Sequence, residues 1–160
     1  MKKREGEILL EIREIQAEDT CRIRHQVLRP NQTIHECKYE GDIDANTFHV
    51  GAILNEELVS IASFYKENHP SFPDVIQYRL RGMATLEHAR NQKAGSSLLH
   101  LAERILEKRN TDLWWCNARV SVSEYYMKLG LQEHGDVFVI DPIGPHKLMF
   151  KRLTDYRENR

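Results

Sequence analysis

The sequence predicts a mixed α/β (α+β) domain built on a central, mostly antiparallel sheet flanked by helices. Residues 48–65 hold two apolar-rich runs separated by a short polar connection, which predicts a hairpin of antiparallel strands. Residues 95–109 repeat apolar side chains at helical spacing, and the apolar run at 113–116 follows as the second strand of a parallel βαβ unit would. Since we find no repeat, linker or low-complexity tract, we expect a single domain over residues 1–160.

The N-terminal part predicts a strand, a helix and a polar loop. Residues 8–15 end in alternation, which is typical of a strand. Residues 17–28 place Ile23 and Val27 one turn apart, which predicts a helix that Pro30 stops. Residues 31–46 should form a loop with one short helix, because they carry four carboxylates that a packed element buries only with difficulty: Glu36, Glu40, Asp42 and Asp44.

The remaining elements follow the same reasoning. Strands are expected at 48–54, 58–65 and 75–85, and a loop with two prolines at 66–74. The helix at 95–109 should end at Asn110, and a short helix at 121–129 should end at Gly130. Residues 137–140 and 147–151 should close the domain as a hairpin.

Composition excludes several classes of protein. The 160 residues include 23 Lys and Arg against 24 Asp and Glu, and a formal net charge of -1 argues against binding nucleic acid. No stretch approaches the roughly 20 apolar residues that span a bilayer, and no signal-peptide pattern opens the sequence. Three cysteines without paired spacing fit reduced thiols. We therefore expect a cytoplasmic protein with no membrane partner, and we leave a homodimer open.

One turn could seat a phosphate. Residues 90–97 connect an expected strand to the N-terminus of the long helix, where unpaired N–H groups and the positive end of the helix dipole favour anions. Taken alone this signal is weak, because many helices begin with small polar residues. Neither a Walker motif nor a three-glycine dinucleotide fingerprint is present, which removes support for kinases and dehydrogenases.

Two linked segments carry a resemblance to a known family. The first is LRGMATLEHARNQKAG at residues 80–95, and the second is EYYMKLGL at residues 124–131. Together, and in this order, they resemble the GCN5-related N-acetyltransferases (GNAT). The resemblance implies the GNAT fold and an enzyme that moves an acetyl group from acetyl-CoA directly to the amine of a small molecule or a protein.

The resemblance also implies which residues bind acetyl-CoA. Asn117 would bond its amide-rich arm, although a plain strand-end turn is an equally good interpretation. Lys93 stands where the family usually has a glycine, which limits backbone freedom but adds a cation. The other binding residues act mainly through the main chain: Met83, Ala84, Thr85, Arg90, Asn91, Gln92, Lys93, Ala94, Gly95 and Ser96.

The catalytic candidates are Tyr126 and His146. By the resemblance, Tyr126 protonates the departing CoA thiolate or donates a hydrogen bond to it. Many relatives carry a glutamate on the strand before the turn, but this sequence has Arg79 and Arg81 there, so a base must be water, His146 or a loop carboxylate. The two arginines favour an acceptor with a carboxylate or phosphate, unless they pair with the acidic loop. Glu36 would border the acceptor and attract its amine.

Two alternatives stay open. Cys21, His25, His35 and Cys37 could hold a zinc ion, although their spacing matches no common ligand pattern and we assign no metal to the protein. An acyl-CoA-binding regulatory module without transfer activity is the other alternative, and Tyr126 argues for the enzyme.

Overall fold

The protein is a mixed α/β fold around a seven-stranded sheet with the order β1-β2-β3-β4-β5-β7-β6. The structure, a computed structural model, describes residues 9–153. Strands β4 and β5 are parallel, whereas β1–β2, β2–β3, β5–β7 and β6–β7 are antiparallel. This confirms the predicted fold class of a mixed, mostly antiparallel sheet with helices.

The chain divides into two compact units, which we describe separately. The first holds the residues up to Tyr65 together with Arg81–Ile105, and the second holds Lys66–Leu80 and the residues from Leu106 onward. Strand β4 (Gln77–Thr85) and helix α2 (Ala94–Lys108) each pass from one unit into the other. The single domain expected over residues 1–160 stays a prediction.

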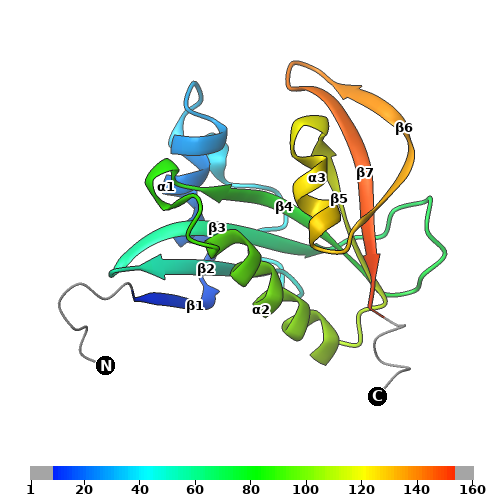
Figure 1. Cartoon of the computed structure of the whole chain (residues 1–160), viewed down its shortest axis with the longest axis horizontal. Coiled ribbons are helices and arrows are strands. Elements are labelled where there is room, and N and C mark those ends of the chain that lie inside the picture. The colour runs from blue at the N-terminus through cyan, green and yellow to red at the C-terminus, as the bar shows by residue number, and fades with distance from the viewer. Residues whose placement is uncertain (1–8, 154–160) are drawn as a thin grey trace. The chain divides into compact units, whose positions relative to one another are not determined.

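Three antiparallel strands build the sheet of the first unit (Figure 1). They are β1 (Leu10–Ile15), β2 (Phe48–Leu54) and β3 (Glu57–Lys66), as the sequence predicts, while Ile8 lies outside the described residues. Asn55 and Glu56 connect β2 to β3 with φ angles of 50° and 73°. Two positive φ angles in a two-residue connection are typical of a type I′ turn, whose twist matches the flanking strands.

The expected N-terminal helix is a single segment that contains three types of helical turn. It comprises a 3₁₀ turn η1 (Ala17–Thr20), α1 (Cys21–Ile23) and a π-helical turn η2 (Arg24–Leu28). The segment ends before Pro30, because proline cannot continue a helix without losing a hydrogen bond. The loop after it contains one short 3₁₀ helix, η3 (Ile34–Cys37), as expected.

Helix α2 carries the strongest periodicity in the sequence and lies close to its predicted bounds. The 3₁₀ turn η4 (Glu87–Ala89) precedes it. Leu98, Ala102 and Leu106 are fully buried, which accounts for the apolar stripe. The helix ends at Lys108, and Asn110 just beyond it has a φ of 58°, which lets the N–H of Thr111 reach the carbonyl of Leu106.

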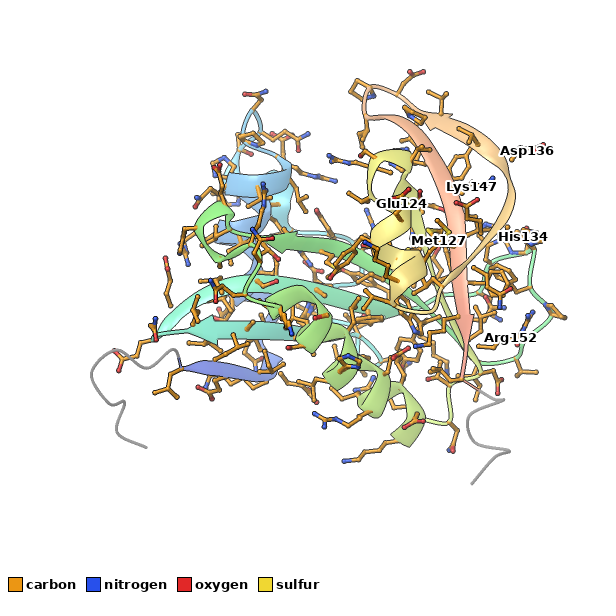
Figure 2. The ribbon with its side chains drawn as sticks, viewed as in Figure 1. Glu124, Met127, His134, Asp136, Lys147 and Arg152 are labelled. Atoms are coloured by element: carbon orange, nitrogen blue, oxygen red, sulfur yellow. The ribbon has the colours of Figure 1, made fainter. Side chains whose placement is uncertain are left out.

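The second unit completes the fold around β5 (Leu113–Arg119). After it come η5 (Val120–Val122), α3 (Ser123–Lys128) and the hairpin of β6 (Gln132–Ile140) and β7 (Gly144–Arg152). The predicted hairpin is confirmed, with longer strands. Figure 2 marks Glu124 and Met127 on α3, and His134 and Asp136 on β6, all of them exposed.

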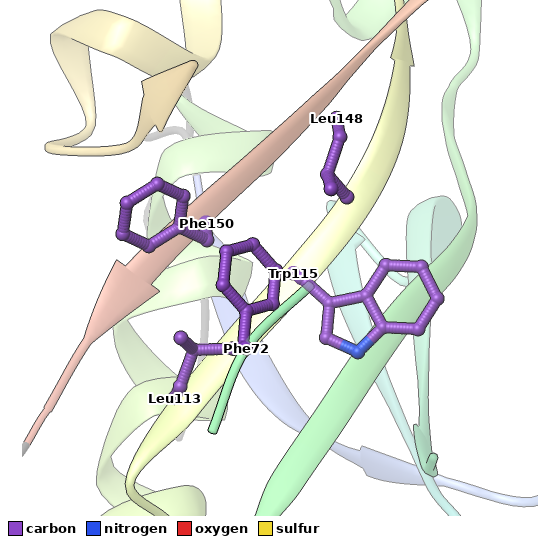
Figure 3. Close-up of a cluster of buried hydrophobic side chains, with 5 residues drawn as sticks. All are labelled: Phe72, Leu113, Trp115, Leu148 and Phe150. Atoms are coloured by element: carbon purple, nitrogen blue, oxygen red, sulfur yellow. The ribbon is translucent and has the colours of Figure 1, made fainter. Parts of the chain in front are cut away.

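The core of the second unit is an aromatic cluster on one face of β5 and β7. Phe72, from the loop before β4, packs against side chains of both strands (Figure 3). Its ring lies 4.8 Å from that of Phe150. The members of this cluster are Phe72, Leu113, Trp115, Leu148 and Phe150.

Within residues 9–153, no helix combines the length and the apolar character that crossing a membrane requires.

Candidate active site

The end of β4 lies in the first unit and presents main-chain groups in a constrained strand. Gly82 has a φ of 63°, a left-handed conformation that interrupts the extended backbone just before Met83. Ser60 of β3 bonds both the Ala84 carbonyl, at 3.3 Å, and the Thr85 hydroxyl, at 2.7 Å. These contacts fix the main chain of residues 83–85, whose donors and acceptors the resemblance assigns to acetyl-CoA.

The turn between β4 and α2 offers a smaller set of N–H donors than the sequence predicts. Those of Arg90 and Gln92 already donate to main-chain carbonyls of the turn, at 3.2 and 3.3 Å. The first donor of α2 that reaches back to the turn is Ser97, which bonds the carbonyl of Lys93 at 3.0 Å. The N–H groups of Ala94, Gly95 and Ser96, the first three residues of α2, therefore form the helix N-terminus open to an anion.

Lys93 and Asn91 both adopt left-handed backbone conformations in this turn. Their φ angles are 61° and 74°, and both side chains are exposed. Asparagine tolerates this region, whereas a lysine there bears a steric cost that glycine does not. Lys93 therefore keeps the backbone geometry that a glycine would have at this position. It also adds an ammonium group at the start of the helix.

Tyr126 lies in the second unit, on α3, and is buried. Burial raises the pKa of its hydroxyl well above the ordinary value of 10.0, with smaller contributions from Cys116 and Tyr125. The side chain is therefore neutral and protonated throughout the physiological range. Such a group can donate a hydrogen bond to a developing anion, but cannot act as a base.

His146, also in the second unit, is buried, and one of its ring nitrogens makes a hydrogen bond within the protein. Its Nδ1 donates to the carbonyl of Gly144 at 2.7 Å, and its ring stacks on Phe138 with centroids 6.0 Å apart. With Nδ1 protonated, the neutral ring carries its lone pair on Nε2. Nε2 is thus the atom that can accept a proton.

The β5–β7 register relates His146 to Asn117. Arg119 faces His146 and Asn117 faces Leu148, so Asn117 and His146 share one face of this strand pair. Cys116, which interacts electrostatically with Tyr126, projects from the opposite face of β5.

Arg79 and Glu36, which are predicted to bind the acceptor, both make polar contacts within the protein. Arg79 pairs with Glu67 at 3.2 Å, and its guanidinium lies 5.0 Å from the Trp115 ring. Glu36 accepts hydrogen bonds from the N–H and hydroxyl of Thr33, at 3.2 and 3.1 Å, and so caps the N-terminus of η3. These contacts give both side chains a structural role, and their binding of the acceptor stays a prediction.

The acidic loop is where the sequence analysis was wrong about burial. Asp42 is buried because Arg24, itself fully buried, bonds it through both terminal nitrogens at 2.7 and 3.1 Å. Burial alone would raise the pKa of Asp42, but the hydrogen bonds from Arg24 and Tyr65 outweigh it and hold that pKa below its ordinary value. The pair is charged, bidentate and inside the protein.

Arg24 organises a cluster that the sequence analysis did not identify. Besides Asp42, it donates to Ser63 at 2.8 Å and to Tyr65 at 3.1 Å. His49 closes the cluster by bonding Ser63 through Nδ1 and the Asp42 carbonyl through Nε2. We name these five residues, Arg24, Asp42, His49, Ser63 and Tyr65, the arginine–aspartate cluster. The available signal was that Arg24 falls on the same helical stripe as Ile23 and Val27.

Two of the four residues of the zinc alternative make other side-chain contacts. His25 bonds the carbonyl of Gln32 at 2.7 Å, and the thiol of Cys37 lies 3.6 Å from the carbonyl of Thr33. Over residues 9–153, no group of three or more histidine, cysteine, aspartate or glutamate side chains is arranged to hold a metal ion. The structure gives the zinc alternative no support.

A family model now decides what this fold is. The model of the Acetyltransferase (GNAT) family matches residues 9–131, which include β4, the turn, α2, β5 and α3. The chain belongs to the GNAT family. The uncharacterized N-acetyltransferase YitI of Bacillus subtilis (strain 168) is 47% identical over 149 residues, which cover 93% of this chain and 100% of that protein.

Solved structures share the GNAT fold at low identity. Escherichia coli ElaA matches with a TM-score of 0.70 at 16% identity, over 89% of this chain and 99% of its own. An aminoglycoside 6'-N-acetyltransferase complexed with coenzyme A matches with 0.70 at 15%, over 89% and 96%. FeeM, an N-acyl amino acid synthase from uncultured soil microbes, matches with 0.77 at 11%, over 95% of both chains.

Family membership settles the general chemistry. The chain is an acyltransferase of the kind that moves acyl groups from acyl-CoA to nitrogen. This agrees with the predicted enzyme class.

Proposed function

We propose that this GNAT protein is an acetyl-CoA-dependent N-acetyltransferase that transfers the acetyl group directly to the amine of a small molecule or a protein. The observation that carries the proposal is segment 83–96 of the first unit. There a strand end with fixed main-chain groups leads into a helix N-terminus with three open N–H donors and a lysine beside it. That sequence of groups suits a long thioester ending in a pyrophosphate.

The residues present fit acetyl-CoA. Main-chain groups of Met83 and Thr85 would pair with its amide-rich arm as a neighbouring strand does. Ala94, Gly95 and Ser96 would bind the pyrophosphate through their N–H groups, and Lys93 would add charge. Acetyl-CoA supplies a thioester carbon that an amine nitrogen attacks, with release of CoA.

Tyr126 donates a hydrogen bond to the sulfur as negative charge develops there. A tyrosine at its reference pKa of about 10 already protonates a thiolate of pKa about 8.5 only uphill. Burial raises the pKa of Tyr126 further, which weakens full proton transfer and keeps the donor present at every physiological pH. Stabilisation of the departing thiolate is therefore its main contribution.

The amine must also lose a proton. Of the bases that the sequence analysis left open, the buried loop carboxylate Asp42 is held by Arg24, and Glu36 caps a helix. His146 retains a lone pair on Nε2, so we propose that His146, directly or through water, takes this proton. Asn117 on the same face would orient the cofactor arm.

All three cysteines are free, in keeping with a cytoplasmic enzyme, and we propose the cytoplasm as its compartment.

A non-catalytic acyl-CoA-binding module is the second candidate, and the lysine in a glycine-like conformation at position 93 is the observation that favours it.

A binding experiment tests the cofactor first. Acetyl-CoA at saturation should raise the melting temperature, whereas ATP and NAD should not, since a ligand that binds only the folded state stabilises it. Absence of any shift with acetyl-CoA contradicts the proposal. Release of CoA thiol across a panel of amines then separates the enzyme from the module: binding without release supports the module.

A further inference from the structure

Three guanidinium groups surround one tyrosine ring in the first unit. The central carbons of Arg24, Arg29 and Arg81 lie 3.9, 4.7 and 4.8 Å from the centroid of Tyr39. That of Arg81 also lies 5.9 Å from the ring of Tyr65. Aromatic faces attract cations, but they leave the repulsion between neighbouring guanidinium groups uncompensated.

Among the described residues, one of these three charges has a carboxylate partner. Asp42 neutralises Arg24. Arg29 bonds two neutral acceptors, the Glu36 carbonyl at 2.9 Å and the Gln32 side-chain oxygen at 3.3 Å. Across residues 9–153, no carboxylate pairs with Arg81. Because Arg29 and Arg81 are half-buried, water screens their charges less than it screens charges on the surface.

The same region is short of hydrogen-bond acceptors. The Nε of Arg24 is buried and has no acceptor among the described residues. It faces Gly82: a Cβ at Gly82 would lie 3.2 Å from this nitrogen and 3.2 Å from the Tyr39 ring. Gly82, between Arg81 and Met83, therefore leaves space next to the Arg24 Nε, a donor without an acceptor among the described residues.

We propose that Arg29 and Arg81 form a subsite for an oxyanion beside Tyr39, and that the acceptor amine carries a carboxylate or a phosphate that binds there. Guanidinium groups are the preferred partners of both anions, because their forked donors match two oxygens. This inference rests on the proposed function, since it names a property of the acceptor. It also separates Arg81 from Arg79, which Glu67 already occupies.

The subsite lies close to the main chain assigned to acetyl-CoA. Arg81 precedes Met83 by two residues on β4, which corresponds to at most about 7 Å of strand. An acceptor that holds its oxyanion at Arg81 can therefore extend along β4 toward Met83 with an amine only a few bonds from the anion.

Matched pairs of amines test the subsite. We would measure kcat/KM for acetylation of β-alanine against β-alaninamide, and of O-phosphoethanolamine against ethanolamine. The native protein should prefer the anionic member of at least one pair, and the pair that responds distinguishes a carboxylate from a phosphate. Arg81→Gln should lower kcat/KM for that anionic member about 10- to 100-fold and change the neutral member less than about threefold.

Further variants separate recognition from folding. Arg81→Lys keeps the charge without the forked donors and should retain part of the preference. Arg29→Gln should act in the same direction as Arg81→Gln. Arg104→Gln, which removes the same charge from an exposed position of α2, should leave the preference unchanged. Melting temperatures with and without acetyl-CoA verify that each variant folds and binds the cofactor.

The possible failures are distinguishable. Acetylation of neutral amines only, or a preference that Arg81→Gln and Arg29→Gln leave intact, overturns the oxyanion subsite while the transferase proposal stands. Stabilisation by acetyl-CoA without acetylation of any member of the pairs counts against transfer itself, and this inference fails with it.

Discussion

The two units illustrate two outcomes of burying an ionisable group. In the first, Arg24 and Asp42 are buried with their charges, because each supplies the hydrogen bonds that the other loses from water. In the second, burial keeps groups neutral: it raises the pKa of Cys116 to about 12 and that of Tyr126 further above its ordinary value. Burial therefore favours the neutral form unless a partner of opposite charge is bonded directly to the buried group, as Arg24 and Asp42 are to each other.

The two units also differ in the contacts that hold their long loops, residues 38–47 in the first and 67–76 in the second. Residues 38–47 are held to the first unit by the arginine–aspartate cluster, and the Tyr39 N–H also bonds the Asp42 carboxylate at 2.9 Å. Residues 67–76 are held to the second unit by Phe72 in the aromatic cluster and by the Trp115 indole, which donates to the Glu67 carbonyl at 2.9 Å. The first loop is therefore held by a buried charged pair, whereas the second combines the apolar packing of Phe72 with hydrogen bonds and the Asp74–Arg152 ion pair, at 3.1 Å.

The largest effect is expected from removing one partner of the buried pair. Arg24→Met should lower the free energy of unfolding by about 3–5 kcal/mol, because Asp42 would be left buried and unpaired. Urea unfolding measures the loss. Arg22→Met, at an exposed neighbouring position, is the matched control and should change stability by less than about 0.5 kcal/mol. A small loss for Arg24→Met would show that the cluster does not hold the loop.

The neutral tyrosine of the second unit should matter for rate more than for stability. Tyr126→Phe should lower kcat about 100-fold, equivalent to about 2.7 kcal/mol, because the donor to the developing thiolate is lost. Acetyl-CoA binding should be unchanged. Tyr125→Phe, at the exposed neighbouring tyrosine, provides the control. Equal rates for the two variants would remove Tyr126 from catalysis.

Each unit also contains a histidine whose pKa is lowered by burial, which favours its neutral form. Burial lowers the pKa of His49 and of His69 below the ordinary 6.5, although Asp42 partly offsets the effect at His49. A lowered folded-state pKa means that the unfolded chain binds the proton more readily. Stability should therefore be complete above about pH 6.5 and decline as the pH falls below it.

Unfolding free energies measured between pH 7.5 and 4.5 test this pH dependence. His69→Asn keeps an acceptor for the Ser71 N–H, which now bonds the imidazole at 3.0 Å, and should flatten the decline. His100→Gln, at an exposed position on α2, should not. A native protein whose stability is constant over this range would contradict the prediction for both histidines.

The smallest effect concerns the turn. Lys93→Gly should raise the free energy of unfolding by about 0.5–1 kcal/mol, because glycine adopts a φ of 61° without the steric cost that lysine bears. Gln92→Gly lacks that relief and should lower stability by a similar amount. If both variants lose stability, the left-handed geometry at position 93 is not strained.

Local patterns were sufficient for most of the elements. Alternation, helical periodicity and turn residues act over a few neighbours, so the hairpin at 48–65, helix α2 and the strand at 113–116 could be predicted within a few residues. Segment 83–96 is proposed to bind acetyl-CoA because of its resemblance to the family, since the turn's own signal in the sequence is weak. The departure at Lys93 is visible in the sequence, whereas its left-handed backbone is not.

Tertiary structure decided which polar side chains are buried, and with which partners. Nothing in the sequence pairs Arg24 with Asp42, 18 positions away, or occupies Arg79 with Glu67 while leaving Arg81 without a carboxylate within residues 9–153. Likewise, only the β5–β7 register places Asn117 and His146 on one face of this strand pair. The sequence by itself determined the elements and the family, because both depend on local order. The charge balance of the site depends on contacts between distant segments, and only the folded chain creates them.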